Sequence, residues 1–94
     1  MNKDAYQQKL QAQLDEWRAD IDKLRARAEQ AEADTRLELQ QQIEALQARH
    51  QAAAEKLDKL RQSGEEAAKT MQSGIEAAWK ELEQATRSAR NRFL

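Results

Sequence analysis

The sequence contains no cysteine, no proline and only two glycines among its 94 residues. Without cysteine the chain cannot form a disulfide or use a thiolate, which fits a reducing compartment. Without proline, and with so little glycine, few residues are available to stop a helix. Valine is absent, and three isoleucines and three threonines leave little β-branched sequence for strands. These absences together predict an all-α protein.

Large apolar side chains are also scarce. Alanine supplies 18 of the 37 residues that make up the 39% hydrophobic fraction, and aromatic residues account for 4% of the chain. A thick globular core is therefore not expected. No run approaches the length of a membrane span, and the first residues lack the apolar segment of a signal peptide. We therefore expect a soluble cytoplasmic protein.

The charges are nearly balanced, with 16 basic and 17 acidic side chains and a net charge of -1. Such a balance provides no overall field to attract nucleic acid or an anionic membrane. Arg87, Arg90 and Arg92 could contact phosphates or lipid headgroups, but the dipole of a helix C-terminus also favours cations there. Nucleic acid is therefore not an expected partner, and attraction to a membrane surface would be weak.

The sequence does contain an apolar stripe with helical spacing. The stripe runs from Tyr6 to Phe93 in steps of three and four residues, which average about 3.6, the period of a straight α-helix. Charged residues occupy the opposite face, and alanine, glutamine, glutamate, leucine, lysine and arginine favour helix throughout. The pattern predicts nearly straight amphipathic helices along the whole chain.

Two Ser-Gly pairs, Ser63-Gly64 and Ser73-Gly74, interrupt the helix-forming sequence. Each serine precedes a glutamate by three residues and so matches a capping box, although the segment between the pairs is too short for a full helix. Arg61 before Gly64 and two acids after it favour a break there. Gly74 would then lie inside a helix or where another helix approaches closely.

The sequence predicts one all-α domain over residues 1–94, with a long amphipathic helix over about 4–62, a break near 63–64 and a shorter helix over about 65–92. The two helices would form either an antiparallel helical hairpin or an extended coiled coil, and a single unbroken helix is the alternative to a fold-back at Gly64.

A second helix that folds back at Gly64 would reach only to about Thr35 and would leave the first third of the stripe uncovered. Six exposed side chains there could contribute up to about 9 to 18 kcal/mol on burial, against an association cost of about 4 to 15 kcal/mol. We therefore predict a homo-oligomer, with a two-fold dimer favoured. The predicted interface consists of Tyr6, Leu10, Leu14, Trp17, Ile21 and Leu24.

A second candidate face lies near the C-terminus, where apolar residues gather on one side. This face would bind lipid or a protein partner, and it consists of Ile75, Trp79, Leu82 and Phe93. It supports an alternative function, in which a surface-active amphipathic helical protein binds lipid or protects membranes and proteins under stress.

Residue types for catalysis or metal binding are few. His50 is the only histidine, and its place on the stripe favours a structural contact with Ala78 over metal binding, because no cysteine or second histidine completes a site. The sequence also lacks a glycine-rich phosphate loop and a Ser-His-Asp arrangement. We therefore expect no enzyme activity and no cofactor or metal.

Three stretches carry a family resemblance: YQQKLQAQLDEWRADIDKL, IEALQARHQAAAEKLDKLR and SGIEAAWKELEQATRSARNRF. The chain resembles a group of short bacterial coiled-coil proteins named as stress-response proteins, over nearly its whole length. The resemblance implies a soluble, non-catalytic protein with a protective or scaffolding role, and it assigns no catalytic or ligand residues. The leading hypothesis is a structural interaction protein that self-associates through its stripe.

Overall fold

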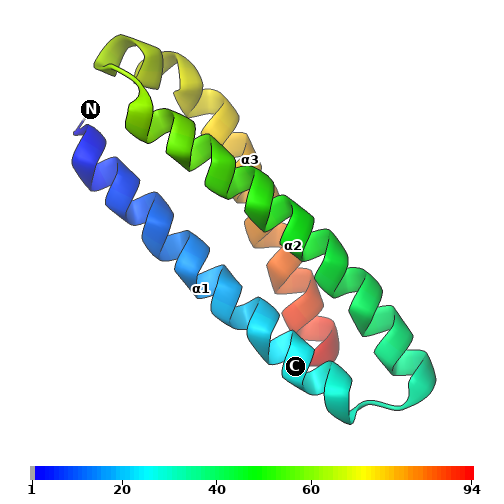
Figure 1. The fold of residues 1–94 in the computed structure, drawn as a ribbon. Coiled ribbons are helices and arrows are strands. Elements are labelled where there is room, and N and C mark those ends of the chain that lie inside the picture. Colours follow the sequence, from blue (N-terminus) through cyan, green and yellow to red (C-terminus); the bar gives the residue numbers. More distant parts are fainter. Residues whose placement is uncertain (1) are drawn as a thin grey trace.

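The computed structural model describes residues 2–94 and contains three α-helices: α1 (Lys3–Gln30), α2 (Ala33–Gln62) and α3 (Glu65–Phe93). The helices form an elongated bundle with dimensions of 50 × 19 × 17 Å, and each helix packs against the other two. α1 and α3 run in the same direction, and α2 runs antiparallel to both (Figure 1). The predicted all-α fold is confirmed.

The predicted continuous helix over 4–62 is wrong, because the chain turns at Ala31 and Glu32. Both residues are extended, with φ and ψ of -83° and 155° at Ala31 and -67° and 162° at Glu32. Alanine and glutamate favour helix by no more than about 0.7 kcal/mol per residue over other ordinary residues. Burial of a single leucine contributes about 1.5 to 3 kcal/mol. Covering the stripe of α1 therefore outweighs the local preference for a straight helix.

Arg36 stabilises the end of α1 at this turn. Its Nε donates to the carbonyl oxygen of Ala28 at 3.2 Å, and its Nη2 donates to that of Ala31 at 3.0 Å. The carbonyl oxygen of Ala28 also accepts from the amide of Ala31, and Arg36 supplies further donors at this helix end, where carbonyls lack their usual partners. The start of α2 has no such support, because its N-cap, Glu32, makes no side-chain capping bond. In α1, by contrast, the side chain of Asn2 accepts from the amide of Ala5 at 3.1 Å.

The second turn lies at Ser63 and Gly64, where the sequence predicted a break, but the predicted capping box is wrong. Ser63 ends α2, and its Oγ donates back to the carbonyl oxygen of Leu60 at 2.7 Å. Gly64 is the N-cap of α3 with φ of -75°, so no left-handed conformation requires glycine here. Gly74 lies inside α3 and has open space around it, so the close-approach alternative is wrong.

The core is the stripe itself, now folded onto three helices. Its side chains come from α1, α2 and α3 and form one continuous cluster along the bundle. In α3 the buried face is wider than the predicted stripe. Ile75 and Leu82 are buried as predicted, and Ala68 and Trp79, which flank the stripe, are buried as well. α3 buries this wider face because it contacts both other helices and not α2 alone.

Candidate functional site: the internal apolar stripe

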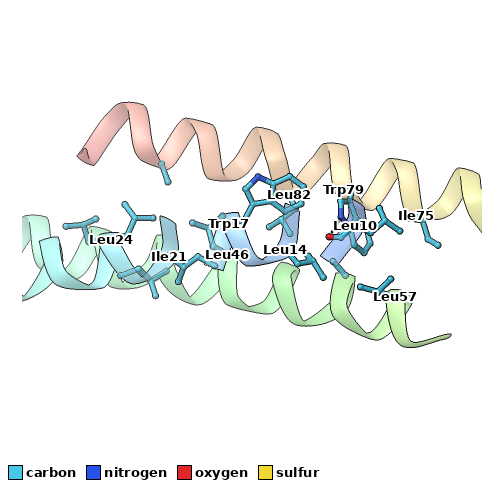
Figure 2. Close-up of a cluster of buried hydrophobic side chains, with 14 of the residues drawn as sticks. Leu10, Leu14, Trp17, Ile21, Leu24, Leu46, Leu57, Ile75, Trp79 and Leu82 are labelled. Atoms are coloured by element: carbon cyan, nitrogen blue, oxygen red, sulfur yellow. Dashed lines mark hydrogen bonds between the residues drawn. The ribbon is translucent and has the colours of Figure 1, made fainter. Parts of the chain in front are cut away.

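The six residues predicted as an intermolecular interface lie inside the bundle. Leu10, Leu14, Trp17, Ile21 and Leu24 are buried, and Tyr6 is half-buried against the same cluster. The prediction that this face is left uncovered is wrong, because the turn at Ala31 and Glu32 places α2 and α3 over it. Figure 2 shows the five buried side chains of this row between the helices. A second copy can therefore reach these residues only if the bundle opens.

The four residues of the second candidate face are also covered in the closed bundle. Ile75, Trp79 and Leu82 are buried, and Phe93 is half-buried near the end of α3. Trp79 is central, because its Nε1 donates to the carbonyl oxygen of Leu10 at 3.3 Å. This bond ties the middle of α3 to α1 within the apolar layer. Ile75, Trp79 and Leu82 are therefore inaccessible to lipid or to a partner while the helices stay together, and Phe93 is partly accessible.

One ion pair fixes the position of α3 along α1. Nη1 of Arg90 lies 3.3 Å from Oδ2 of Asp20, whose side chain is only 9% exposed. A buried carboxylate without a cation would be costly, so this pair disfavours other alignments of the two helices. The sequence pattern gave no sign of the contact, because Asp20 falls beside the stripe and 70 residues before Arg90.

A second polar contact joins α1 to α2. Nε2 of His50 lies 2.8 Å from the carbonyl oxygen of Leu14, and because a carbonyl can only accept, the ring nitrogen donates. His50 therefore has a structural contact, as expected, and this hydrogen bond joins it to α1. At the other end, the ammonium group of Lys3 donates to the carbonyl oxygen of Ser63 and so contacts the turn between α2 and α3.

Two buried hydroxyl groups lack a hydrogen-bond partner. Thr86 Oγ1 and the phenolic oxygen of Tyr6 are both enclosed without one in residues 2–94. Burial raises the pKa of Tyr6, and the nearby negative charge of Glu76 raises it further. Both effects favour the neutral phenol. Because each buried hydroxyl lacks a partner, each lowers the stability of the bundle.

The outer surface carries few large apolar side chains. Two large apolar side chains are exposed among the described residues, Leu37 at 59% and Leu94 at 56%. A hollow of about 690 Å³ lies between α1 and α2 near their turn, lined by Ala28, Ile43 and the charged side chains of Arg25, Glu29, Arg36 and Glu44. This mixture of charges has no single sign that would select an anion or a cation.

The arginines near the C-terminus are engaged within the bundle. Arg87 pairs with Glu83 at 2.7 Å, Arg92 pairs with Glu38 of α2, and Arg90 is held by α1. They therefore form contacts within and between helices, and an acidic side chain lies beside each of the three. In residues 2–94 no group of three or more His, Asp or Glu side chains is placed to hold a metal ion.

No family model, curated protein or solved structure matches this chain. None of the three helices in the described residues has an apolar stretch long enough to cross a bilayer.

Proposed function

We propose that the protein is a non-catalytic interaction protein that self-associates through its apolar stripe. One observation carries the proposal: turns of only two residues join three helices of 28, 30 and 29 residues. Short turns between long packed helices favour the exchange of a helix between copies, because a small change at the turn moves a whole helix. The resemblance to stress-response coiled-coil proteins adds the expectation of a protective or scaffolding role.

Exchange of helices explains how the stripe can join two copies although the closed bundle covers it. A helix from a second copy can make every contact that the chain's own helix makes, including the bond from Trp79 to Leu10. The outer surface offers a second copy fewer apolar contacts than the stripe, because its exposed large apolar side chains are Leu37 and Leu94. A dimer formed by exchange therefore buries the same core as the monomer and needs no new interface.

The protein concentration at which dimers form follows from the competition between the chain's own helix and the helix of a second copy. A helix held by a short linker has an effective concentration of about 1 mM at its own docking face. If the contacts are equal, a second copy competes only near that concentration. If the turns are more stable in the open form, exchange begins at a lower protein concentration. We therefore expect monomers at about 10 µM and exchanged dimers at about 1 mM.

The test is to unfold the protein and refold it at each of these concentrations. Size-exclusion chromatography followed by sedimentation equilibrium should find dimers only in the concentrated sample. The dimers should dissociate slowly on dilution, because separation requires the helices to unpack. A protein that stays monomeric after refolding at about 1 mM would refute self-association.

The surface-active alternative also requires the bundle to open. It predicts that lipid, and not a second copy, covers Ile75, Trp79 and Leu82 after opening. Trp79 is a suitable probe because it is buried in the closed bundle.

A further inference from the structure

We propose that two copies exchange α1 and that they do so by straightening the turn at Ala31 and Glu32. α1, the turn and α2 then become one helix from Lys3 to Gln62, with 28, 2 and 30 residues, or 60 in all. Such a helix is about 90 Å long. The inference rests on the proposed self-association and identifies the hinge and the helix that moves.

The sequence of this turn favours the open form. The chain reads Gln30-Ala31-Glu32-Ala33, and each of these residues is a good helix former. The turn has no glycine, proline, asparagine or serine, and neither of its residues needs a special backbone conformation. The packing of α1 on its neighbours, together with the two bonds donated by Arg36, holds the extended conformation. When a second copy supplies the same packing, the residues of the turn can adopt the helical conformation that their sequence favours.

Straightening also restores backbone hydrogen bonds. The first amides of α2 lack acceptors in the closed bundle, and Glu32 provides no side-chain cap. In a continuous helix the carbonyls at the end of α1 would accept from these amides. Arg36, which now donates to Ala28 and Ala31, would be released. Four backbone bonds would replace two side-chain bonds.

The turn between α2 and α3 has the opposite preference. Gly64 lowers helix stability by about the full glycine penalty relative to alanine, and Ser63 Oγ caps the carbonyl oxygen of Leu60. Lys3 of α1 also donates to the carbonyl of Ser63. Local sequence and contacts therefore hold this turn closed. The difference between the two turns selects α1, and not α3, as the exchanged helix.

Exchange of α1 preserves the contacts that define the core. The bonds from His50 to Leu14 and from Trp79 to Leu10, and the pair between Arg90 and Asp20, would all form between copies. The two long helices would lie antiparallel, with their hinges at a two-fold axis. Each half of the dimer would then be a three-helix bundle like the monomer.

Proline at position 32 separates the two states. Glu32 has φ of -67°, Ala31 before it is extended, and within the described chain the turn's backbone bonds are donated by Ala31 and Arg36. Glu32→Pro therefore fits the closed turn. Proline lowers the equilibrium constant for straightening the turn about 150-fold in each chain. The association constant of the dimer, which contains two straightened chains, should therefore fall by roughly 10⁴-fold.

Gly64→Pro is the matched control. Gly64 has φ of -75° and follows Ser63, whose φ and ψ are -91° and 154°, so proline also fits this turn. This variant should dimerise within about threefold of the unmodified protein, because exchange of α1 leaves the second turn closed. Circular dichroism and melting temperatures should show both proline variants folded and at least as stable as the unmodified protein, since proline restricts the unfolded chain.

The experiment refolds the three proteins at about 1 mM and measures dimer fractions by sedimentation. Dimers of the unmodified protein and of Gly64→Pro, with monomeric Glu32→Pro, would support the inference. Dimers of Glu32→Pro with monomeric Gly64→Pro would show exchange of α3 and overturn it, as would equal dimerisation of all three, which indicates association without straightening. In both of those cases self-association itself stands. Monomers in every sample would refute both proposals.

A milder variant guards against a folding defect in Glu32→Pro. Glu32→Gly places no demand on φ but disfavours the straight helix about fivefold in each chain, or roughly 25-fold for the dimer. The order of dimerisation should be unmodified protein, then Glu32→Gly, then Glu32→Pro. A glycine variant that dimerises as well as the unmodified protein would overturn the inference.

Discussion

Replacing Gly74 with alanine is expected to stabilise the protein by about 1 kcal/mol, the difference in helix propensity between the two residues. Gly74 lies inside α3 at an exposed position. A Cβ built there meets no atom within 4 Å, so the substitution introduces no clash. The gain therefore comes from backbone entropy alone.

The same substitution at Gly64 is expected to have almost no effect. Gly64 also has no atom within 4 Å of a built Cβ, so space does not distinguish the two sites. Its position does, because it is the N-cap of α3 in an extended conformation. Alanine is a poor N-cap and costs about 0.5 to 1 kcal/mol there, which offsets an entropic gain of about 0.4 to 1 kcal/mol.

Urea unfolding followed by circular dichroism at 222 nm would measure both changes. At about 10 µM the unmodified protein and the two variants should unfold as monomers. For a chain of this length, about 1 kcal/mol raises the melting temperature by about 4 to 8 °C. If Gly74→Ala is no more stable than the unmodified protein, or if both variants gain equally, the assignment of the two glycines to helix interior and helix cap is incorrect.

Three further outcomes follow from the contacts. Tyr6→Phe should match or exceed the unmodified protein in stability at pH 7, because it removes a buried hydroxyl without a partner. Burial and Glu76 raise the pKa of Tyr6 in the folded state, so ionisation of the phenol above pH 10 costs the folded protein stability. The free energy of unfolding measured from pH 8 to 12 should therefore fall less steeply in the variant, which has no phenol. A double-mutant cycle for Asp20 and Arg90 should give a coupling of about 1 to 2 kcal/mol, and a value as small as that of an exposed surface pair, about 0.5 kcal/mol or less, would show that the pair does not fix the helix alignment. In a Trp17→Phe background, the fluorescence of Trp79 should stay unchanged with anionic vesicles, and a shifted emission would favour the surface-active alternative.

The helices themselves could be predicted because their causes are local. The spacing of the stripe and the helix-forming composition indicated helix along the whole chain, and the loss of helix propensity at Ser63-Gly64 indicated a turn. The first turn could not be predicted in this way. Ala31 and Glu32 favour helix, and their extended conformation depends on contacts between α1, α2 and α3.

The candidate site shows the same division. The sequence identified the large apolar residues of α1 as a face that must be covered, and the structure covers them. It could not show what covers them, because a stripe with helical spacing is equally compatible with a second copy and with a fold-back of the same chain. The ion pair between Asp20 and Arg90 was also hidden, since it joins residues far apart in the chain.

The sequence by itself determined that the chain is helical and that one face of each helix is apolar, because propensity and periodicity act over a few residues. Only the tertiary structure decided the number of helices and the partners of each face. The physical reason is the size of the terms: preferences of less than about 1 kcal/mol per residue shape the helices, whereas burial of the stripe sums over many side chains. That sum is large enough to bend the chain at Ala31 and Glu32, where the local sequence favours a straight helix.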